Sequence, residues 1–186
     1  QTLFSANLIA DVLPRIWQRS PEEGLQSLEE LRQLTRGALA EMRTLLLEMR
    51  PESLQRADIK SLIIQLADAF VGRVRIPLQL EITGSCTLSQ EEKVVFYRVA
   101  QEALNNIAKP SGARQVKLHM ECQPNQMRMR IQDDGLGFEP GAVTPEHMGL
   151  TIMRERASSI GASLKIESQV GQGTIVELVW VSTRRN

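Results

Sequence analysis

The sequence predicts an α+β protein in which an N-terminal helical hairpin precedes a two-layer α/β sandwich with one mixed sheet. Residues 1–50 contain almost no glycine, and their apolar residues recur at helical spacing. After residue 59, helical patterns interleave with short alternating strands. Pro51 separates the two regions, because proline disfavours helical dihedrals in the preceding residue. We therefore expect a hairpin domain over 1–54 and a second domain over 55–186.

The first helix of the hairpin carries its apolar residues on one face, and Pro14 predicts that it bends or weakens there. The second helix begins after Ser20, which is a good cap and is followed by Pro21 and two acidic residues near the positive end of the helix dipole. The apolar residues of the first helix are Phe4, Leu8, Val12, Ile16 and Trp17.

In the second helix, apolar or small residues follow alternating steps of three and four, as in a coiled-coil seam. These residues are Leu28, Leu31, Thr35, Ala38, Met42, Leu45 and Met49. Two helices with broad apolar stripes cannot bury the whole of both stripes against each other. Dimerisation into a four-helix bundle is therefore favoured over packing of the hairpin on the downstream domain of the same chain.

The second domain is expected to begin with a helix over 59–71 and a strand over 76–82. Ser89 and Glu92 form a capping box that opens a long helix ending near Lys109. The next segments, 116–120 and 127–131, alternate around a turn and predict a hairpin. A helix over 149–160 and closing strands over 164–166 and 175–181 complete the sandwich.

Composition narrows the possible partners. The formal net charge is +0, which gives no electrostatic reason to expect nucleic acid binding. No apolar run approaches the ~20 residues of a membrane span, and there is no signal peptide. Cys86 and Cys122 are far apart in sequence and are expected to be reduced thiols. These observations favour a cytoplasmic location, with no membrane contact from this stretch.

One face of the long helix carries polar residues. Arg98, Glu102, Asn106 and Lys109 share this stripe, beside an apolar stripe that includes Ala103. Taken alone, such a stripe more often faces solvent. A carboxylate, an amide oxygen and an ammonium group one turn apart would nevertheless suit a magnesium triphosphate, because Mg²⁺ prefers oxygen ligands.

Three glycine-rich segments follow. In 133–138 (DDGLGF), Asp133 ends an apolar strand, where it could accept a hydrogen bond from an amine such as that of adenine. Gly135 and Gly137 would let the backbone approach a flat base, although the segment taken alone favours a plain tight turn.

Gly149 and Leu150 open a helix whose amides could hold phosphate, or they mark an ordinary helix start. The segment 171–174 (GQGT) is a hairpin turn or a ligand contact through the Thr174 hydroxyl. The polar loop 139–147 would suit a mobile lid.

In this order, the four elements resemble the nucleotide-binding boxes of the superfamily of histidine kinases, gyrases, heat-shock chaperones and mismatch-repair ATPases. Residues 101–109 (QEALNNIAK) resemble the asparagine box, and 133–138, 149–157 and 171–174 resemble the three glycine boxes. The MRERA sequence of 153–157 is similar to that of sensor kinases of nitrate-sensor and membrane-thermosensor type. Residues 48–54 (EMRPESL) resemble the end of their dimerisation and phosphotransfer domain.

The resemblance implies a Bergerat-type ATP-binding fold with ATP and Mg²⁺ as cofactors. Asn106 would be the metal ligand, Asp133 would accept the adenine amine, and Lys109 would contact phosphate. Glu102 matches the position that activates water in the hydrolytic branch, and here it would polarise the site or organise the metal. The remaining lining residues would be Gly135, Gly137, Gly149, Leu150, Gly171, Gly173 and Thr174.

The implied activity is that of a two-component sensor histidine kinase. Such a kinase works as a homodimer, transfers the ATP γ-phosphoryl group to a histidine, and passes it to an aspartate of a response-regulator receiver domain; the parent could be membrane-tethered. The phosphoacceptor histidine would precede Gln1, and neither His119 nor His147 can replace it. We therefore expect this chain to begin inside the phosphoacceptor helix and to be unable to autophosphorylate.

Two alternatives remain at this stage. One is an ATP hydrolase or serine-directed kinase of the same superfamily. The other is a non-catalytic dimerisation and docking module with a degenerate pocket. Pro110 favours the second alternative, because it stands where the family usually has histidine. Proline there would end the helix at Lys109 and could turn the Lys109 side chain away from a phosphate.

Overall fold

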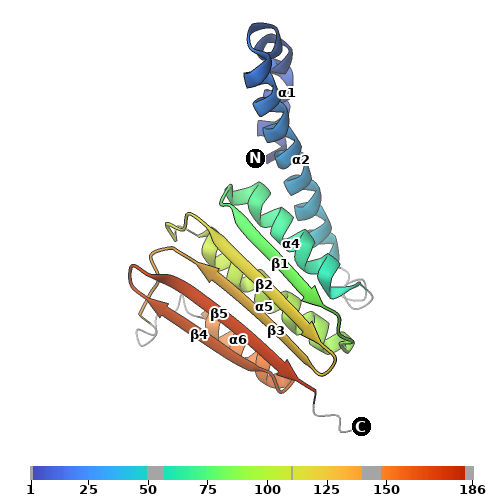
Figure 1. Cartoon of the computed structure of the whole chain (residues 1–186), viewed down its shortest axis with the longest axis vertical. Coiled ribbons are helices and arrows are strands. Elements are labelled where there is room, and N and C mark those ends of the chain that lie inside the picture. The colour runs from blue at the N-terminus through green and yellow to red at the C-terminus, as the bar shows by residue number, and fades with distance from the viewer. Residues whose placement is uncertain (1, 50–56, 110, 140–147, 183–186) are drawn as a thin grey trace.

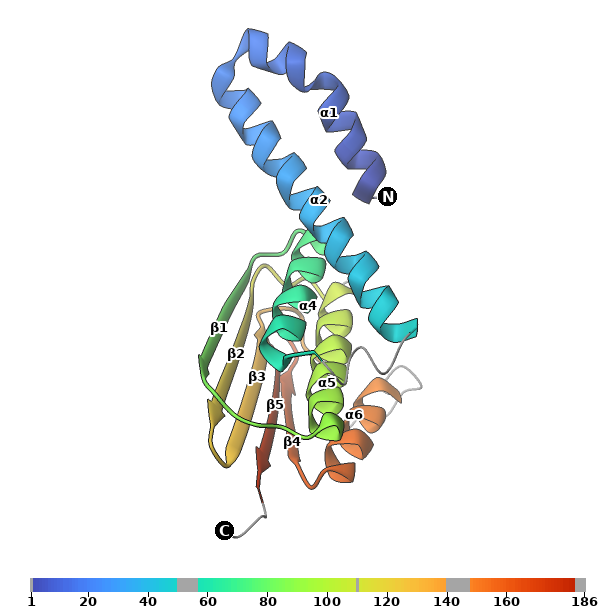
Figure 2. The same ribbon diagram turned by 90° about the vertical axis from the view of Figure 1, so that its right-hand side faces the viewer.

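The computed structural model describes residues 2–49, 57–109, 111–139 and 148–182. Its N-terminal part is a helical hairpin of α1 (Thr2–Arg19) and α2 (Pro21–Met49), which projects from an α/β unit (Figures 1 and 2). Ser20 caps α2, since its Oγ accepts a hydrogen bond from the Glu23 amide at 3.3 Å. The α1 helix runs through Pro14 without interruption, so the predicted weakening does not end the helix.

The α/β unit is the predicted two-layer sandwich with a mixed sheet. Its strand order is β1-β2-β3-β5-β4, with β1 parallel to β2 and every other pair antiparallel. Three helices, α4, α5 and α6, cover one face of this sheet (Figure 2). Its elements are α4 (Ile59–Val74), β1 (Leu78–Gly84), α5 (Gln90–Ala108), β2 (Val116–Gln123), β3 (Gln126–Asp133), α6 (Met148–Ser159), β4 (Ser163–Gln169) and β5 (Gly173–Val181).

Several strands are longer than the sequence predicts, and two boundaries shift around Arg75. Helix α4 continues to Val74, and β1 begins at Leu78 instead of residue 76. Arg75 explains both shifts: it adopts left-handed dihedrals (φ 57°), and its amide donates to the Val71 carbonyl at 3.0 Å. This closes α4 one turn later than predicted, and Pro77, which has no N–H to donate, precedes the first paired residue of the strand.

Helix α5 follows the prediction closely. The capping box at its start is present, with the Glu92 amide donating to Ser89 Oγ at 3.2 Å and the Ser89 amide donating to Glu92 Oε2 at 2.7 Å. Its apolar stripe is buried against the sheet. Lys109 has extended dihedrals and caps the helix, as expected for a residue before proline, although Pro110 itself lies outside the described residues.

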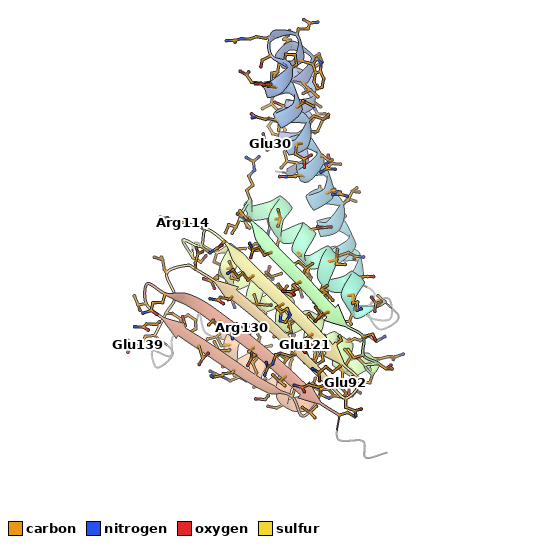
Figure 3. All side chains as sticks on the ribbon, viewed as in Figure 1. Glu30, Glu92, Arg114, Glu121, Arg130 and Glu139 are labelled. Atoms are coloured by element: carbon orange, nitrogen blue, oxygen red, sulfur yellow. The ribbon has the colours of Figure 1, made fainter. Side chains whose placement is uncertain are left out.

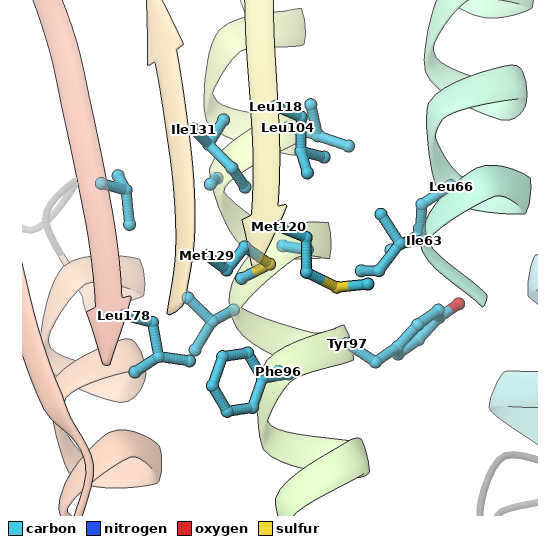
Figure 4. Close-up of a cluster of buried hydrophobic side chains, with 14 of the residues drawn as sticks. Ile63, Leu66, Phe96, Tyr97, Leu104, Leu118, Met120, Met129, Ile131 and Leu178 are labelled. Atoms are coloured by element: carbon cyan, nitrogen blue, oxygen red, sulfur yellow. The ribbon is translucent and has the colours of Figure 1, made fainter. Parts of the chain in front are cut away.

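The core lies between α4, α5 and the sheet (Figure 4). Phe96 and Tyr97 of α5 are fully buried, and each large apolar side chain of this kind stabilises the fold by about 1.5–3 kcal/mol. Facing residues of the sheet include Leu118, Met120, Met129, Ile131 and Leu178. This core holds the carboxyl end of α5 in a fixed position above the ends of β3 and β5.

The other face of the sheet is polar (Figure 3). Arg128 and Arg130 of β3 both lie 3.9 Å from the Glu177 carboxylate of β5. On this face, His119 of β2 stands opposite Glu81 of β1 and Arg130 of β3. Such partly exposed ion pairs contribute little stability, and their pattern is typical of a solvated sheet face.

The two cysteines, distant in sequence, come together in the fold. Cys86 follows β1 and Cys122 lies on the paired strand β2, and both are free thiols. Burial, with hydrogen bonding to Cys122, raises the pKa of the Cys86 thiol to about 12. The protonated, unreactive form therefore prevails at neutral pH.

The hairpin contacts the sandwich through α2 and α4. A Cβ atom placed on Gly37 would lie 2.4 Å from Gly72 Cα, so the two helix backbones touch directly. Leu34 and Ala38 of α2 are buried at this contact, and Glu30 pairs with Arg75 at 3.0 Å. Part of the second helix thus packs within its own chain, the less favoured of the two sequence-based alternatives.

Two of the other predicted seam residues are exposed in the single chain. Leu28 and Met42 of α2 are exposed, as are Phe4 and Leu8 of α1. The hairpin therefore keeps an apolar surface that its own chain does not cover.

Candidate nucleotide-binding site

A cavity of about 280 Å³ lies between α5, α6 and the ends of β3 and β5. Its walls are mainly apolar and include a few polar groups, a composition typical of small-molecule sites. The lining residues are Ala103, Asn106, Ile107, Lys109, Ser111, Ile131, Asp133, Leu136, Gly137, Phe138, Leu150, Met153, Thr174 and Val176. Six predicted site residues are among them: Asn106, Lys109, Asp133, Gly137, Leu150 and Thr174.

Asp133 is the polar group at the end of β3. Only 6% of the residue is exposed, and its Oδ1 accepts a hydrogen bond from the Gly135 amide at 2.8 Å. Desolvation raises the pKa of this carboxyl, while the backbone amides of Gly135 and Thr174 act in the opposite direction. A buried carboxylate with this little protein hydrogen bonding can accept further bonds from a ligand.

Two glycines let the loop after β3 meet the β4–β5 hairpin. Gly137 has φ +58°, and a Cβ there would lie 2.1 Å from the Gln169 carbonyl oxygen. Gly173 has φ +78°, and its Cβ would lie 2.1 Å from the Asp133 carbonyl oxygen. Only glycine fits either place, because of both the space and the dihedrals.

The other predicted glycines do not line the cavity. Gly135 and Gly173 lie behind its wall, and Gly171 is in the β4–β5 turn, where its amide donates to the Leu136 carbonyl at 2.6 Å. Gly149 lies against α5, since a Cβ on it would be 2.2 Å from Glu102 Oε1. These glycines shape the loops around the cavity, whereas direct ligand contact from them stays a prediction.

Another part of the cavity wall is formed by the last turn of α5 and the residues after it. Lys109 Nζ donates to Asn106 Oδ1 at 2.9 Å, so the ammonium and the amide oxygen are adjacent as the spacing predicts. Ser111 also lines the cavity, and its Oγ donates to the Ile107 carbonyl at 2.9 Å. Lys109 can neutralise an anionic group, and Asn106 can offer an oxygen ligand.

Glu102 and Arg98, from the same predicted stripe, are not among the lining residues. Glu102 borders a separate shallow hollow with Arg73, Asn105 and Lys109. Arg98 bonds to Gln101 Oε1 at 2.8 Å and stacks near the Tyr97 ring. In the amino-terminal half of α5, the polar stripe therefore no longer faces the cavity. At 3.6 residues per turn, each successive residue of the stripe is rotated further around the helix axis.

Two residues that sequence reasoning missed hold the cavity loops. Asp134 Oδ1 accepts hydrogen bonds from the amides of Arg114 and Gln115, at 2.7 Å and 2.9 Å. Both hydrogen bonds lower the pKa of the Asp134 carboxyl, and the bond from the Gln115 amide has the larger effect. Ser168 of β4 bonds to the Phe138 amide at 2.9 Å. An aspartate before glycine is a turn signal, but its distant partner is not visible in sequence.

The predicted lid is almost entirely outside the described residues, which end at Glu139 and resume at Met148. His147 falls in the same interval.

The geometry agrees with what comparison to known proteins shows. Residues 91–184 match the family described as histidine kinase-, DNA gyrase B-, and HSP90-like ATPase, and residues 1–54 match a family described as histidine kinase. The chain belongs to the histidine kinase-, DNA gyrase B- and HSP90-like ATPase family. Within it, the chain corresponds to the dimerisation and ATP-binding region of sensor histidine kinases.

Its relatives carry the same description. It is 29% identical over 178 residues to the sensor histidine kinase LiaS of Bacillus subtilis, covering 96% of this chain and 49% of LiaS. It is 33% identical over 177 residues to the sensor histidine kinase YhcY of the same organism, covering 94% of this chain and 44% of YhcY. The chain thus spans about half the length of these curated relatives.

Solved structures show the same fold. The histidine kinase domain of the Erythrobacter litoralis EL346 blue-light activated kinase aligns with a TM-score of 0.59 and 19% identity, covering 95% of this chain and 94% of that one. Full-length ShkA in complex with AMPPNP aligns with a TM-score of 0.56 and 16% identity, covering 88% of this chain and 38% of ShkA. The predicted sandwich fold is confirmed. Among the described residues, no helix has the length and apolar character needed to cross a membrane.

Proposed function

We propose that the cavity binds ATP with Mg²⁺, and that the protein containing this chain is a histidine kinase of a two-component system. It would transfer the γ-phosphoryl group to a histidine, from which an aspartate of a response-regulator receiver domain takes it. The observation that carries the proposal is the cavity itself. It is a mainly apolar slot whose lining includes a buried carboxylate, Asp133, and an ammonium group, Lys109.

The slot suits an adenine nucleotide in both shape and polarity. Apolar side chains such as Ile107 and Met153 would contact the faces of the base. The buried Asp133 carboxylate would accept a hydrogen bond from the adenine amine, a bond that a charged acceptor strengthens. Lys109 would then lie toward the phosphates.

The residues present also fit Mg²⁺. Within the described ranges there is no cluster of three or more His, Cys, Asp or Glu side chains that could hold a metal ion. Magnesium at a nucleotide site needs few protein ligands, because phosphate and water oxygens complete its octahedron. Asn106 Oδ1 would supply the protein ligand beside Lys109. The bound metal would neutralise charge on the phosphates during transfer.

What the chain's own residues do is mainly positioning. Asp133 and Thr174 would fix the base, and Asn106 and Lys109 would hold the phosphates, so that the γ-phosphoryl group meets its acceptor in line. Glu102 would polarise the site or organise the metal from the neighbouring hollow, where it lies against Gly149.

The test is Mg²⁺-ATP binding measured by isothermal titration calorimetry. Asp133→Asn should weaken ATP binding by about 10- to 100-fold, because a charge-assisted hydrogen bond is lost. Asp68→Asn on the exposed side of α4 is the matched control and should bind as the wild type does. Equal affinity of D133N and wild type would remove Asp133 from the site.

The hairpin supports a homodimer as part of the same proposal. Phe4 is 76% exposed and Leu8 57% exposed on α1, and a second copy would cover them in a four-helix bundle. Residues 1–54 would then form the dimerisation and phosphotransfer domain, and 55–186 the ATP-binding domain. Sedimentation velocity should show a dimer that Leu8→Glu dissociates, whereas Asn7→Glu on the exposed polar side should leave it intact.

A further inference from the structure

One serine directly behind the cavity joins three segments that surround it. Ser168 Oγ lies 2.9 Å from the Phe138 amide nitrogen, 3.0 Å from the Gly173 carbonyl oxygen and 3.1 Å from Thr174 Oγ1. Phe138 and Thr174 line the cavity, whereas Ser168 does not. The serine therefore reaches the cavity only through its partners.

The chemistry of those partners sets the direction of the three hydrogen bonds. The Phe138 amide can only donate, and the Gly173 carbonyl can only accept. A serine hydroxyl has one hydrogen and two acceptor lone pairs. We assign its hydrogen to the Gly173 carbonyl, which has no hydrogen of its own to give, and one lone pair to the Phe138 amide. The other lone pair can therefore only receive the hydrogen of the Thr174 hydroxyl.

Thr174 consequently presents lone pairs to the cavity. Its single hydrogen is used on Ser168, so toward a ligand Thr174 Oγ1 acts as an acceptor. The ionised Asp133 carboxylate is also an acceptor only, and the Thr174 amide is one of the groups that favour its ionised form. The same end of the cavity thus holds two acceptor groups side by side, because Gly173 brings β5 against the Asp133 backbone.

We propose that Ser168 is a positioning residue that contributes to base specificity, an inference that rests on the proposed nucleotide site. By holding the Thr174 hydroxyl as an acceptor, Ser168 makes this end of the cavity favour a purine with an exocyclic amine over one with a carbonyl. An amine donates to the acceptors. Inosine carries a carbonyl oxygen there and a hydrogen on the neighbouring N1: the N1–H can still donate to Asp133, but the carbonyl oxygen would turn its lone pairs toward those of Thr174, which has no hydrogen left to offer.

The test compares the affinities of the full chain for ATP and for inosine triphosphate, which has a carbonyl in place of the amine, both with Mg²⁺. Ser168→Ala frees the Thr174 hydrogen, which can then be donated to a carbonyl. The preference for ATP should fall about five- to tenfold, chiefly through tighter binding of inosine triphosphate. Ser168→Thr keeps the hydroxyl and should restore the preference. Ser163→Ala, at the exposed start of β4, is the matched control and should keep the wild-type ratio.

A purely structural role for Ser168 would give a different result. Loss of the Phe138 contact alone would weaken both nucleotides by the same factor, and an unchanged ratio in S168A overturns the proposal. In a Thr174→Val background, S168A should leave the ratio unchanged, and a further fall there would also overturn it. If the wild-type chain binds neither nucleotide, the proposed nucleotide site itself fails, which is distinct from a wild-type preference that S168A does not alter.

Discussion

Two glycines in the β4–β5 turn provide a matched test of how tightly the cavity loops are packed. Gly171 and Gly173 have nearly the same dihedral, with φ +81° and φ +78°. A Cβ atom on Gly171 would meet nothing within 4 Å, whereas one on Gly173 would lie 2.1 Å from the Asp133 carbonyl oxygen. Alanine at the two positions therefore differs in steric contact and not in backbone conformation.

The expected magnitudes follow from these contacts. Gly171→Ala carries only the left-handed penalty, which lowers the free energy of unfolding by about 1–2 kcal/mol. Gly173→Ala carries the same penalty, and the Asp133 backbone must also withdraw by about 0.9 Å to reach the 3.0 Å that real Cβ contacts respect. Overpacking of this kind adds about 1–3 kcal/mol. G173A should therefore lose about 2–5 kcal/mol in total.

The assay is urea unfolding followed by circular dichroism, with Mg²⁺-ATP binding measured on the same samples. G173A should bind ATP more weakly than G171A, because the movement displaces Asp133 at the end of the cavity. Equal losses of stability in the two variants would show that the β5 start and the end of β3 are not in the close contact described, and the reasoning would be refuted.

Three further predictions concern charge and helix packing. Burial raises the pKa of Asp133 above its ordinary value of 3.8, so the folded state binds this proton more tightly and loses stability as pH rises through that window. D133N should therefore unfold at a higher urea concentration than wild type at neutral pH, with a margin that disappears in acid; a less stable D133N would contradict this. The pKa of Asp134 is lowered, so its contribution to folding stability is present above pH 3.8 and is lost as the pH falls. In unfolding measurements, Asp134→Ala should therefore be modestly less stable than wild type at neutral pH and equal to it in acid. A leucine at position 37 cannot fit against Gly72, so Gly37→Leu should lower the free energy of unfolding by about 1–3 kcal/mol and speed amide hydrogen exchange in α4. Gly161→Ala is the control: there is open space around Gly161, and exchange in α4 should stay unchanged.

Local signals explain what could be predicted from the sequence. The Ser89–Glu92 capping box, the apolar stripe of α5 and the β2–β3 hairpin all depend on residues within a few positions of one another. The same holds for Asn106 and Lys109, which one helical turn places together. Asp133 could be placed at the end of a strand because the apolar alternation stops there.

Contacts between distant segments could not be predicted in the same way. Asp134 bonds to amides 19 and 20 positions earlier, and Ser168 bonds to an amide 30 positions earlier, so no spacing rule connects them. The Gly37–Gly72 contact is also hidden, because glycine contributes nothing to an apolar pattern. The stripe reasoning placed Glu102 with Asn106, but the helical twist puts it in the adjacent hollow.

Where Gly37 meets Gly72, the backbones of α2 and α4 touch with no side chain between them. Gly72 touches Gly37, and the next residue, Arg73, donates from Nη2 to Asn105 Oδ1 at 2.9 Å. Asn105 is adjacent in sequence to Asn106 in the cavity. A rotation or sliding of α2 therefore cannot be absorbed by rotamer changes at the two glycines. It must either displace α4 or separate α2 from α4. The hairpin and the cavity are thus connected by a short series of direct contacts that begins where Gly37 meets Gly72.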